Sequence, residues 1–293
     1  MLEYVNVRAS ETLGQQELVQ FLKSRYPKRT RLVGRSVVEG TECVETRVSS
    51  NSTEFCEIRD FIQKKRALGQ HGFSDFSIGW YVRKYSESEL QKAEVLRLMI
   101  NSHFEPCGEE CGTLYETICN YCNLGHQKSE LILDLRRVPQ AKDISESIAW
   151  IEWCVSNRFV EACQQGGLLG AAFAPIVEFK NPSTVSKGWH QLRITGNAGT
   201  LSSSTKLGAD PFSPSKCNWR CPLGHSRVTE FLSEIYLNRT EWNGTDIALT
   251  ADLFGQGRNL LRPTPLIIIS QKMFRALRVA NIKGFSCEIA HLV

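Results

Sequence analysis

The sequence predicts an α+β fold: an internally duplicated zinc-knuckle plus strand–helix–strand module, preceded by a mixed α/β N-terminal region. Three observations support this prediction. A cysteine-containing sequence occurs twice, at residues 119–126 and 217–225, and both copies close on Leu-Gly-His. A strand–helix–strand pattern follows each copy, and the hydrophobic periodicity of the first hundred residues alternates between helical and extended patterns. These patterns divide the chain into regions 1–104, 105–180 and 181–293.

Composition and charge narrow the class of protein. The 293 residues carry a formal net charge of +4, which is too small by itself to indicate a nucleic-acid partner. The sequence starts without the basic and apolar stretches of a signal peptide, and no apolar run is long enough to cross a membrane. Eleven cysteines is an odd number, in a chain long enough to fold without disulfides. We therefore expect a cytoplasmic, metal-binding protein without a membrane segment.

Hydrophobic spacing and capping patterns predict the elements of the N-terminal region. Apolar residues recur at helical spacing behind Ser10 and Thr12, and a hairpin turn is expected at Gly40-Thr-Glu. A capping-box pattern, Ser86-Glu-Ser-Glu89, predicts the start of a further helix. The expected elements are a helix over 18–26, strands over 31–39 and 43–48, a helix over 55–66, a strand over 76–85 and a helix over 86–100.

The repeated cysteine sequences predict a metal site. The first reads Cys119-Asn-Tyr-Cys122, and the second reads Cys217-Asn-Trp-Arg-Cys221. Two cysteines at such spacing, followed by a glycine that permits a tight turn, can present two thiolates to one metal ion. Two such loops supply the four ligands of a closed tetrahedral zinc site. We expect one structural Zn²⁺ per chain, bound by Cys119, Cys122, Cys217 and Cys221.

Other ligand sets remain open. Cys107 and Cys111 form a third pair, which would allow a local site with Cys119 and Cys122. His126 and His225 follow the two loops and could also take part. A histidine beside a metal loop is more often a supporting or surface group, so both histidines are left out of the predicted ligand set.

The segments after the two loops follow the same order of elements. Each reads as a strand, a short helix at Asp143 or Asp246, and then a strand–helix–strand. The distance from Ser156 to Gly170 equals that from Ser270 to Gly284, and both serines are expected to cap helices. The second copy differs mainly by a Gly/Arg-rich insertion at residues 253–263. We infer an internal duplication.

No pattern predicts an active site. The glycines of residues 166–170 follow a predicted helix instead of opening one, which favours a helix C-cap over a phosphate-binding loop. Asp143 and Asp246 occupy matching positions, and we interpret them as helix caps rather than as a catalytic carboxylate pair. We expect a protein that is not an enzyme.

The C-terminal region carries the excess of positive charge and offers an alternative function. A zinc-ribbon protein could use these residues to bind nucleic acid. A solvated helix face explains several of them equally well, and no aromatic residues alternate with them. The basic residues are Arg258, Arg262, Lys272, Arg275, Arg278 and Lys283.

The paired cysteine loops, together with the final segment from Pro265 to Val293, resemble the bacterial double-CXXCG motif proteins and related polymorphic-toxin immunity proteins. The resemblance covers residues 107–293; one extra residue between Cys217 and Cys221 departs from the family pattern. It implies a non-enzymatic protein that binds and neutralises a cognate toxin. Because loops tolerate change and arginine is enriched at interfaces, we expect the insertion to contact the partner through Arg258 and Arg262.

Overall fold

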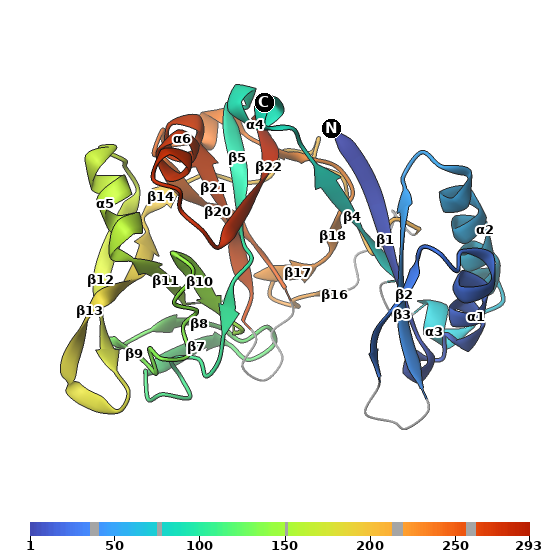
Figure 1. Cartoon of the computed structure of the whole chain (residues 1–293), viewed down its shortest axis with the longest axis horizontal. Coiled ribbons are helices and arrows are strands. Elements are labelled where there is room, and N and C mark those ends of the chain that lie inside the picture. Colours follow the sequence, from blue (N-terminus) through green and yellow to red (C-terminus); the bar gives the residue numbers. More distant parts are fainter. Residues whose placement is uncertain (36–40, 75–77, 150–151, 213–218, 256–261) are drawn as a thin grey trace. The chain divides into compact units, whose positions relative to one another are not determined.

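The computed structural model describes residues 1–35, 41–74, 78–149, 152–212, 219–255 and 262–293. The chain is mixed α+β, as predicted, and its contacts define two compact units (Figure 1). Unit 1 comprises Met1–Ser86, Lys206–Asn218 and Val228–Ser233. Unit 2 comprises Glu87–Thr205, Trp219–Arg227 and Glu234–Val293. The regions 1–104, 105–180 and 181–293 rest on repeats in the sequence, whereas the two units are defined by contacts between residues. The two divisions therefore differ.

Unit 1 is an antiparallel sheet of order β2-β3-β1-β4, covered on one face by α1 and α2 (Figure 1). Alternate residues of β1, Val5, Val7 and Ala9, belong to the buried core together with Leu22 of α1 and Ile58 of α2. Asp210, from a later segment, accepts a hydrogen bond from Arg66 (3.2 Å) and so fixes that segment to the unit. The elements are β1 (Leu2–Ser10), α1 (Gln16–Arg25), β2 (Thr30–Arg35), β3 (Glu42–Ser49), α2 (Thr53–Ala67), α3 (His71–Ser74), β4 (Gly79–Lys84), β15 (Leu207–Gly208) and β18 (Glu230–Phe231).

Unit 2 contains two larger sheets and a small hairpin. The first sheet has the order β6-β10-β11-β13-β12-β9, and the second has the order β16-β17-β20-β21-β5-β22-β19 with β14 paired to β20. Strands β7 (Tyr115–Cys119) and β8 (Leu124–Gln127) form the hairpin. The strands of the first sheet are β6 (His103–Phe104), β9 (Leu131–Leu133), β10 (Ile144–Ser147), β11 (Trp153–Ser156), β12 (Ala171–Glu178) and β13 (Asn181–Ile194). Those of the second are β5 (Val95–Ile100), β14 (Gly196–Asn197), β16 (Trp219–Arg220), β17 (Ser226–Val228), β19 (Ile235–Leu237), β20 (Ile247–Phe254), β21 (Thr264–Ser270) and β22 (Phe285–Leu292).

The main core of unit 2 is shared by both sheets and by the two helices α5 (Asn157–Gln165) and α6 (Gln271–Val279). The two helices contact each other and contribute Phe159, Phe274 and Leu277 to this core. Each helix begins as predicted: the Ser156 hydroxyl accepts the N–H of Phe159, and the Ser270 hydroxyl accepts the N–H of Met273. Both strand–helix–strand segments are therefore fixed to a common core.

Each of these two segments contains the same pair of hydrogen bonds. Ser156 donates its N–H to the Asp143 carbonyl and its hydroxyl to the Asp143 carboxylate, both at 2.9 Å. Ser270 makes the same two bonds to Asp246, at 2.9 and 2.6 Å.

The same carboxylates also reach across to the other segment. Asp143 accepts the backbone N–H of Lys283 (2.8 Å), and Asp246 accepts that of Leu169 (2.9 Å). A glycine follows each of these residues, and both glycines have positive φ, 97° at Gly170 and 110° at Gly284. A Cβ at Gly170 would overlap the carbonyl oxygen of Ile247, and one at Gly284 would overlap that of Ile144. Each segment thus holds the loop of the other.

Two predictions of secondary structure were wrong. The helix expected over 86–100 is only α4 (Glu87–Lys92), and the apolar run that follows it is the strand β5. This strand pairs with both β21 and β22, and that tertiary pairing overrides the helical pattern. Asp143 and Asp246 precede the strands β10 and β20 and do not cap helices of their own. They bind the capping serines instead.

Candidate metal centre

The β7–β8 hairpin positions the first two cysteines. Cys119 ends β7 opposite Leu124, and Cys122 lies in the turn between the strands. Asn123 completes the turn in the left-handed region (φ 53°), a conformation that asparagine tolerates well. The turn aims the backbone N–H of Leu124 at the Cys122 sulfur. We refer to residues 119–126 as the first loop.

The second loop, residues 221–226, positions Cys221 and His225. It is a tight turn in which Gly224 donates to the Cys221 carbonyl and Cys221 donates to the Ser226 carbonyl, both at 2.9 Å. Gly224 has a φ of 79°, the left-handed conformation expected of the loop glycine. The turn directs the backbone N–H groups of Leu223 and His225 toward the Cys221 sulfur.

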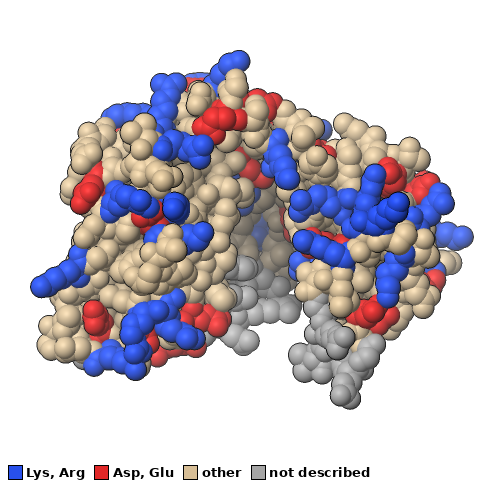
Figure 2. Space-filling model, viewed as in Figure 1, with Lys and Arg blue, Asp and Glu red and all other residues tan. Residues whose placement is uncertain are grey.

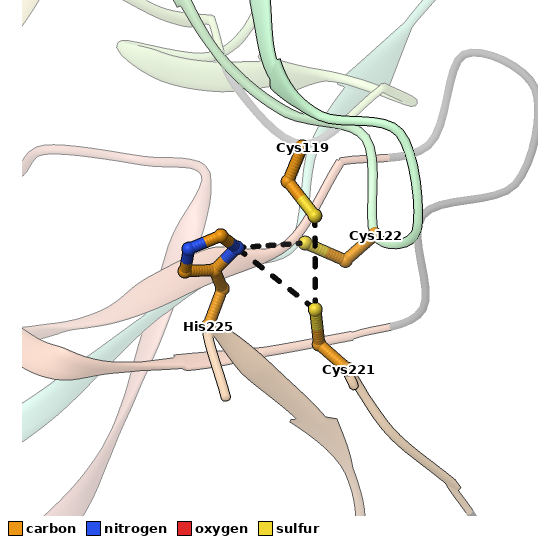
Figure 3. Close-up of side chains that lie close together, drawn as sticks. All are labelled: Cys119, Cys122, Cys221 and His225. Carbon is orange, nitrogen blue, oxygen red and sulfur yellow. Dashed lines mark hydrogen bonds between the residues drawn. The ribbon is translucent and has the colours of Figure 1, made fainter. Parts of the chain in front are cut away.

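The two loops meet, although their cysteines are about a hundred residues apart in sequence. Figure 3 shows Cys119, Cys122, Cys221 and His225 pointing toward a common centre. The Cys119 and Cys221 sulfurs are 3.7 Å apart, and the Nδ1 atom of His225 is 3.9 Å from the sulfurs of both Cys122 and Cys221. The three cysteines are buried and free, whereas the histidine is partly exposed.

These distances fit a tetrahedral metal ion. Zinc binds sulfur at about 2.3 Å and imidazole nitrogen at about 2.0–2.1 Å, which places two sulfurs ~3.8 Å apart and a sulfur and a nitrogen ~3.6 Å apart. In the part of the chain that the structure describes, this is the one group of three or more Cys, His, Asp or Glu side chains whose ligand atoms all lie within 4.8 Å of one another. The cluster could therefore hold a metal ion.

The environment of the thiols differs between the two loops. Burial raises the pKa of the Cys122 thiol, and the backbone N–H of Leu124 offsets this only in part. Burial acts in the same direction on Cys221, but the backbone N–H groups of Leu223 and His225 outweigh it and lower the pKa of that thiol. The second loop therefore stabilises a thiolate before any metal binds.

The structure brings together three of the four predicted ligands. Cys119, Cys122 and Cys221 lie in the cluster, and the fourth predicted ligand, Cys217, lies outside the described residues. His225, which was left out of the predicted set, is in the cluster. The signal for it was its place directly after the loop glycine, which the second loop shares with the first.

The histidine at the corresponding place in the first loop has another role. His126 lies in β8, opposite Glu116 of β7, and its Nε2 atom is 3.2 Å from that carboxylate. Lys128 pairs with the same carboxylate at 2.6 Å. His126 therefore belongs to an exposed polar group on the hairpin and is not in the cysteine cluster.

Cys107 and Cys111 do not join the cluster either, so the local alternative has no support among the described ligands. Both lie buried in a turn held by Glu152, whose carboxylate accepts the N–H of Gly108 (2.9 Å) and the hydroxyl of Tyr115 (2.7 Å). Burial raises the pKa of the Cys107 thiol to about 11 and raises the pKa of the Glu152 carboxyl. This arrangement fixes the turn to β7, the strand that ends at Cys119.

Arg262, predicted to contact a partner, is buried. Its guanidinium pairs with Glu109 at 2.8 Å and lies 4.7 Å from the centre of the Tyr115 ring. Gly125 makes room for it, since a Cβ there would lie 2.5 Å from Nη1 of Arg262. Arg262 thus packs against the β7–β8 hairpin that carries the first loop. Little of its side-chain surface remains exposed for contact with a partner. The other predicted anchor, Arg258, lies outside the described residues.

The basic C-terminal residues are partly engaged within the protein. Arg278 pairs with Glu87 (3.0 Å), and Lys272 donates to the Gly167 carbonyl (2.8 Å). On the face of unit 2 drawn in Figure 2, basic side chains are scattered among acidic and uncharged ones. Neither observation favours a nucleic-acid surface.

A cavity of 220 Å³ adjoins the second loop. Its lining includes Cys221 and His225 of the cluster, together with Arg220 and the Arg227–Asp252 ion pair (2.7 Å). The cysteine–histidine cluster is thus reached from solvent on the side of the second loop.

Comparison with protein-family models found no match, and no curated protein was significantly similar to the chain. Among the helices of the described residues, none is long and apolar enough to cross a lipid bilayer.

Proposed function

We propose that the chain is a non-enzymatic protein-binding factor, stabilised by a structural zinc site, that binds and neutralises a cognate toxin. The observation that carries the proposal is the cluster of Cys119, Cys122, Cys221 and His225, which pins two distant loops together and presents apolar side chains on them. The toxin as partner rests on the resemblance of the cysteine loops and the final strand–helix–strand to immunity proteins.

The ligand set supports zinc and a structural role. Three thiolates and one imidazole form a common zinc-binding combination, and four protein ligands leave no open position for a substrate or an activated water. Bound zinc would stabilise the folded state. The ligands come from distant segments that lie together only when the chain is folded, so the free energy of zinc binding adds to the free energy of folding.

The surface of the two loops supports protein binding. Because Cys119 and Cys122 point inward, the residues beside them are presented to solvent: Ile118 is 56% exposed and Tyr121 is 60% exposed. Leu223, between Cys221 and His225, is 59% exposed. All three residues lie close in sequence to the cysteines whose ligand atoms lie within 4.8 Å of one another. Large exposed apolar groups on a rigid scaffold are typical of protein interaction sites.

We also infer that the metal loops and the strand–helix–strand segments arose by duplication of one module. The matching bonds of Ser156 with Asp143 and of Ser270 with Asp246 support this inference. The parallel pairing of β9 with β12 and of β19 with β22 at corresponding places supports it further.

The zinc site is tested by metal analysis of protein purified under reducing, chelator-free conditions. We expect about one zinc per chain. Absence of metal would contradict the proposal, and a second equivalent would indicate a further site, for example one using Cys107 and Cys111. A zinc-dependent hydrolytic activity, lost when the cysteines are replaced in a folded protein, would contradict the structural role.

The binding surface is tested by placing a charge on it. Tyr121→Glu and Leu223→Glu should abolish co-purification of a partner in near-equimolar amount with the tagged protein. Val279→Glu, at an 89% exposed apolar position on α6 of the same unit, is the matched control and should retain the partner. Co-expression with the captured protein should restore growth if that protein is a toxin. Equal capture by all three variants would contradict this surface, and steeply salt-dependent capture of nucleic acid would favour the alternative function.

A further inference from the structure

One pair of sulfurs in the cluster joins the two loops. The sulfurs of Cys119 and Cys221 are 3.7 Å apart, whereas a disulfide bond is about 2.05 Å long. A movement of roughly 1.7 Å would therefore bond them covalently. Cys119 is the last residue of β7, and Cys221 opens the turn of the second loop, so each sulfur lies beside a turn.

One of the two sulfurs can be reached by a small oxidant. Cys221 lines the 220 Å³ cavity, which also exposes His225 and Arg220. A water molecule occupies about 30 Å³ of liquid volume, so the cavity admits a molecule of the size of hydrogen peroxide. All three cysteines of the cluster have little exposed surface, but only Cys221 lines this cavity.

We propose that Cys119 and Cys221 form a peroxide-sensitive pair: on oxidation, a disulfide bond replaces the metal ion that joins the two loops. This inference rests on the proposed metal site. The Cys221 thiolate attacks one oxygen of H₂O₂; the O–O bond breaks, and with one proton taken up this gives the sulfenic acid and one water. The Cys119 thiolate then attacks the Cys221 sulfur; the S–O bond breaks, and with a second proton taken up this releases a second water. Two thiolates are oxidised and one peroxide is reduced.

The geometry favours this pair over the other cysteines. Cys221 lines the cavity, and its sulfur lies 3.7 Å from that of Cys119 on the other loop. Cys107 and Cys111 are buried thiols of raised pKa and lie outside the cluster. After the reaction only Cys122 and His225 remain as ligands, and two ligands do not retain zinc as four do.

The products keep the two loops together. The disulfide joins the same segments that the metal joined, so the apolar surface of Ile118, Tyr121 and Leu223 survives the loss of zinc. Oxidation would therefore release one metal ion without separating the loops.

Tryptic mapping of the purified protein tests the pair. The zinc content is measured first, then hydrogen peroxide is added while a chromogenic chelator follows zinc release, and thiols are alkylated before digestion. Trypsin isolates Cys221 in residues 221–227 and Cys217 in residues 217–220, and it leaves Cys119 on the peptide 98–128. We expect the peptide 221–227 joined to 98–128, with fragment ions placing the bond at Cys119, and one zinc released per bond formed. Cys56, which is exposed on α2, reports the oxidation of a simple surface thiol.

Three results would contradict the proposed disulfide between Cys119 and Cys221. The first is a disulfide from Cys221 to Cys122, Cys217 or Cys107. The second is irreversible oxidation of Cys221 without a cross-link, and the third is zinc release without a linked peptide. Protein that contains no zinc before oxidation would instead contradict the proposed metal site, and the peptide map would still decide on the pair. Cys119→Ala should abolish the linked peptide; if this variant does not fold, the map of the unaltered protein is sufficient.

Discussion

The two loops of the metal centre share the letters Leu-Gly-His but use them differently. In the second loop the turn continues through His225, so the imidazole stays beside the Cys221 sulfur at 3.9 Å. In the first loop β8 already begins at Leu124, so His126 lies in a strand and pairs with Glu116 across the hairpin. The same residue types thus contribute to the cysteine–histidine cluster in a turn and to a surface polar pair in a strand. A repeated motif predicts the contact between the loops better than the role of each residue.

The glycines of the two loops differ in the same way. Gly224 has positive φ, and an added Cβ would meet no atom within 4 Å. Gly125 lies in an ordinary strand but is closely surrounded by the Glu116 carbonyl oxygen and the Arg262 guanidinium. One glycine is required for its backbone conformation and the other for lack of a side chain.

Loss of a metal-binding thiolate should have the largest effect. Cys119→Ser and Cys221→Ser, one in each loop, should each remove most of the bound metal and lower the free energy of unfolding by about 4 kcal/mol or more, since both the metal and the link between loops are lost. Thermal unfolding with parallel metal analysis measures this, with exposed Cys56→Ser as the control that should change neither. A stable, metal-free Cys221→Ser protein would show that the link contributes little.

Alanine substitutions at Gly125 and Gly224 should show that the first glycine is needed for space and the second for its backbone conformation. Gly125→Ala should cost roughly 3 kcal/mol, because the new methyl group meets backbone of a paired strand and a buried guanidinium. Gly224→Ala should cost only about 1–2 kcal/mol, from the positive φ alone. Denaturant unfolding of both variants measures the difference, and a larger cost at Gly224 would reverse the comparison.

The two histidines give the most direct test of the ligand set. His225→Ala should weaken metal binding at least about tenfold, which corresponds to ~1.4 kcal/mol, whereas His126→Ala should leave it unchanged. Cys217→Ser should also leave it unchanged if His225 is the fourth ligand. Competition with a chelator of known affinity measures all three; metal loss in Cys217→Ser with no effect of His225→Ala would restore the four-cysteine prediction.

A smaller effect on stability is expected at Asp143, where the two strand–helix–strand segments make matching hydrogen bonds. Burial tends to raise the pKa of Asp143, but hydrogen bonds from Arg158 and the Lys283 backbone outweigh it and lower the pKa. Its stabilising contribution is therefore present above the unfolded pKa, about 3.9, and is lost as the pH falls through the lower folded value. Asp143→Asn should lose up to about 1 kcal/mol at pH 7 and show a flatter acid limb below pH 4 than the unaltered protein. Parallel acid limbs would show that Asp143 contributes no pH dependence.

The strand–helix–strand segments could be predicted because local rules decide them. Ser156 and Ser270 cap helices with amphipathic spacing, and glycines of positive φ end the following turns. The strand β5 could not be predicted in this way. Its residues follow a capping-box helix, and only pairing with β21 and β22, far away in sequence, decides that they are extended.

The metal cluster shows the same limit. The spacing of Cys119 and Cys122 and the repeat at Cys221 predicted that the two loops meet. The inclusion of His225 depends on where β17 begins, and the burial of Arg262 depends on the lack of a side chain at Gly125. Both features follow from strand pairing and side-chain packing, and the repeated Leu-Gly-His motif does not determine either of these.

The crossed bonds of Asp143 and Asp246 set an order of events during synthesis. Leu169 is made before its partner Asp246, and Lys283 is made 140 residues after its partner Asp143. At about 5–20 residues per second, Asp143 waits roughly 7–28 s for the hydrogen bond from Lys283. Until α6 is made, α5 lacks the helix that it contacts in the finished core. Slowing translation should therefore lengthen the time for which the apolar face of α5 is exposed.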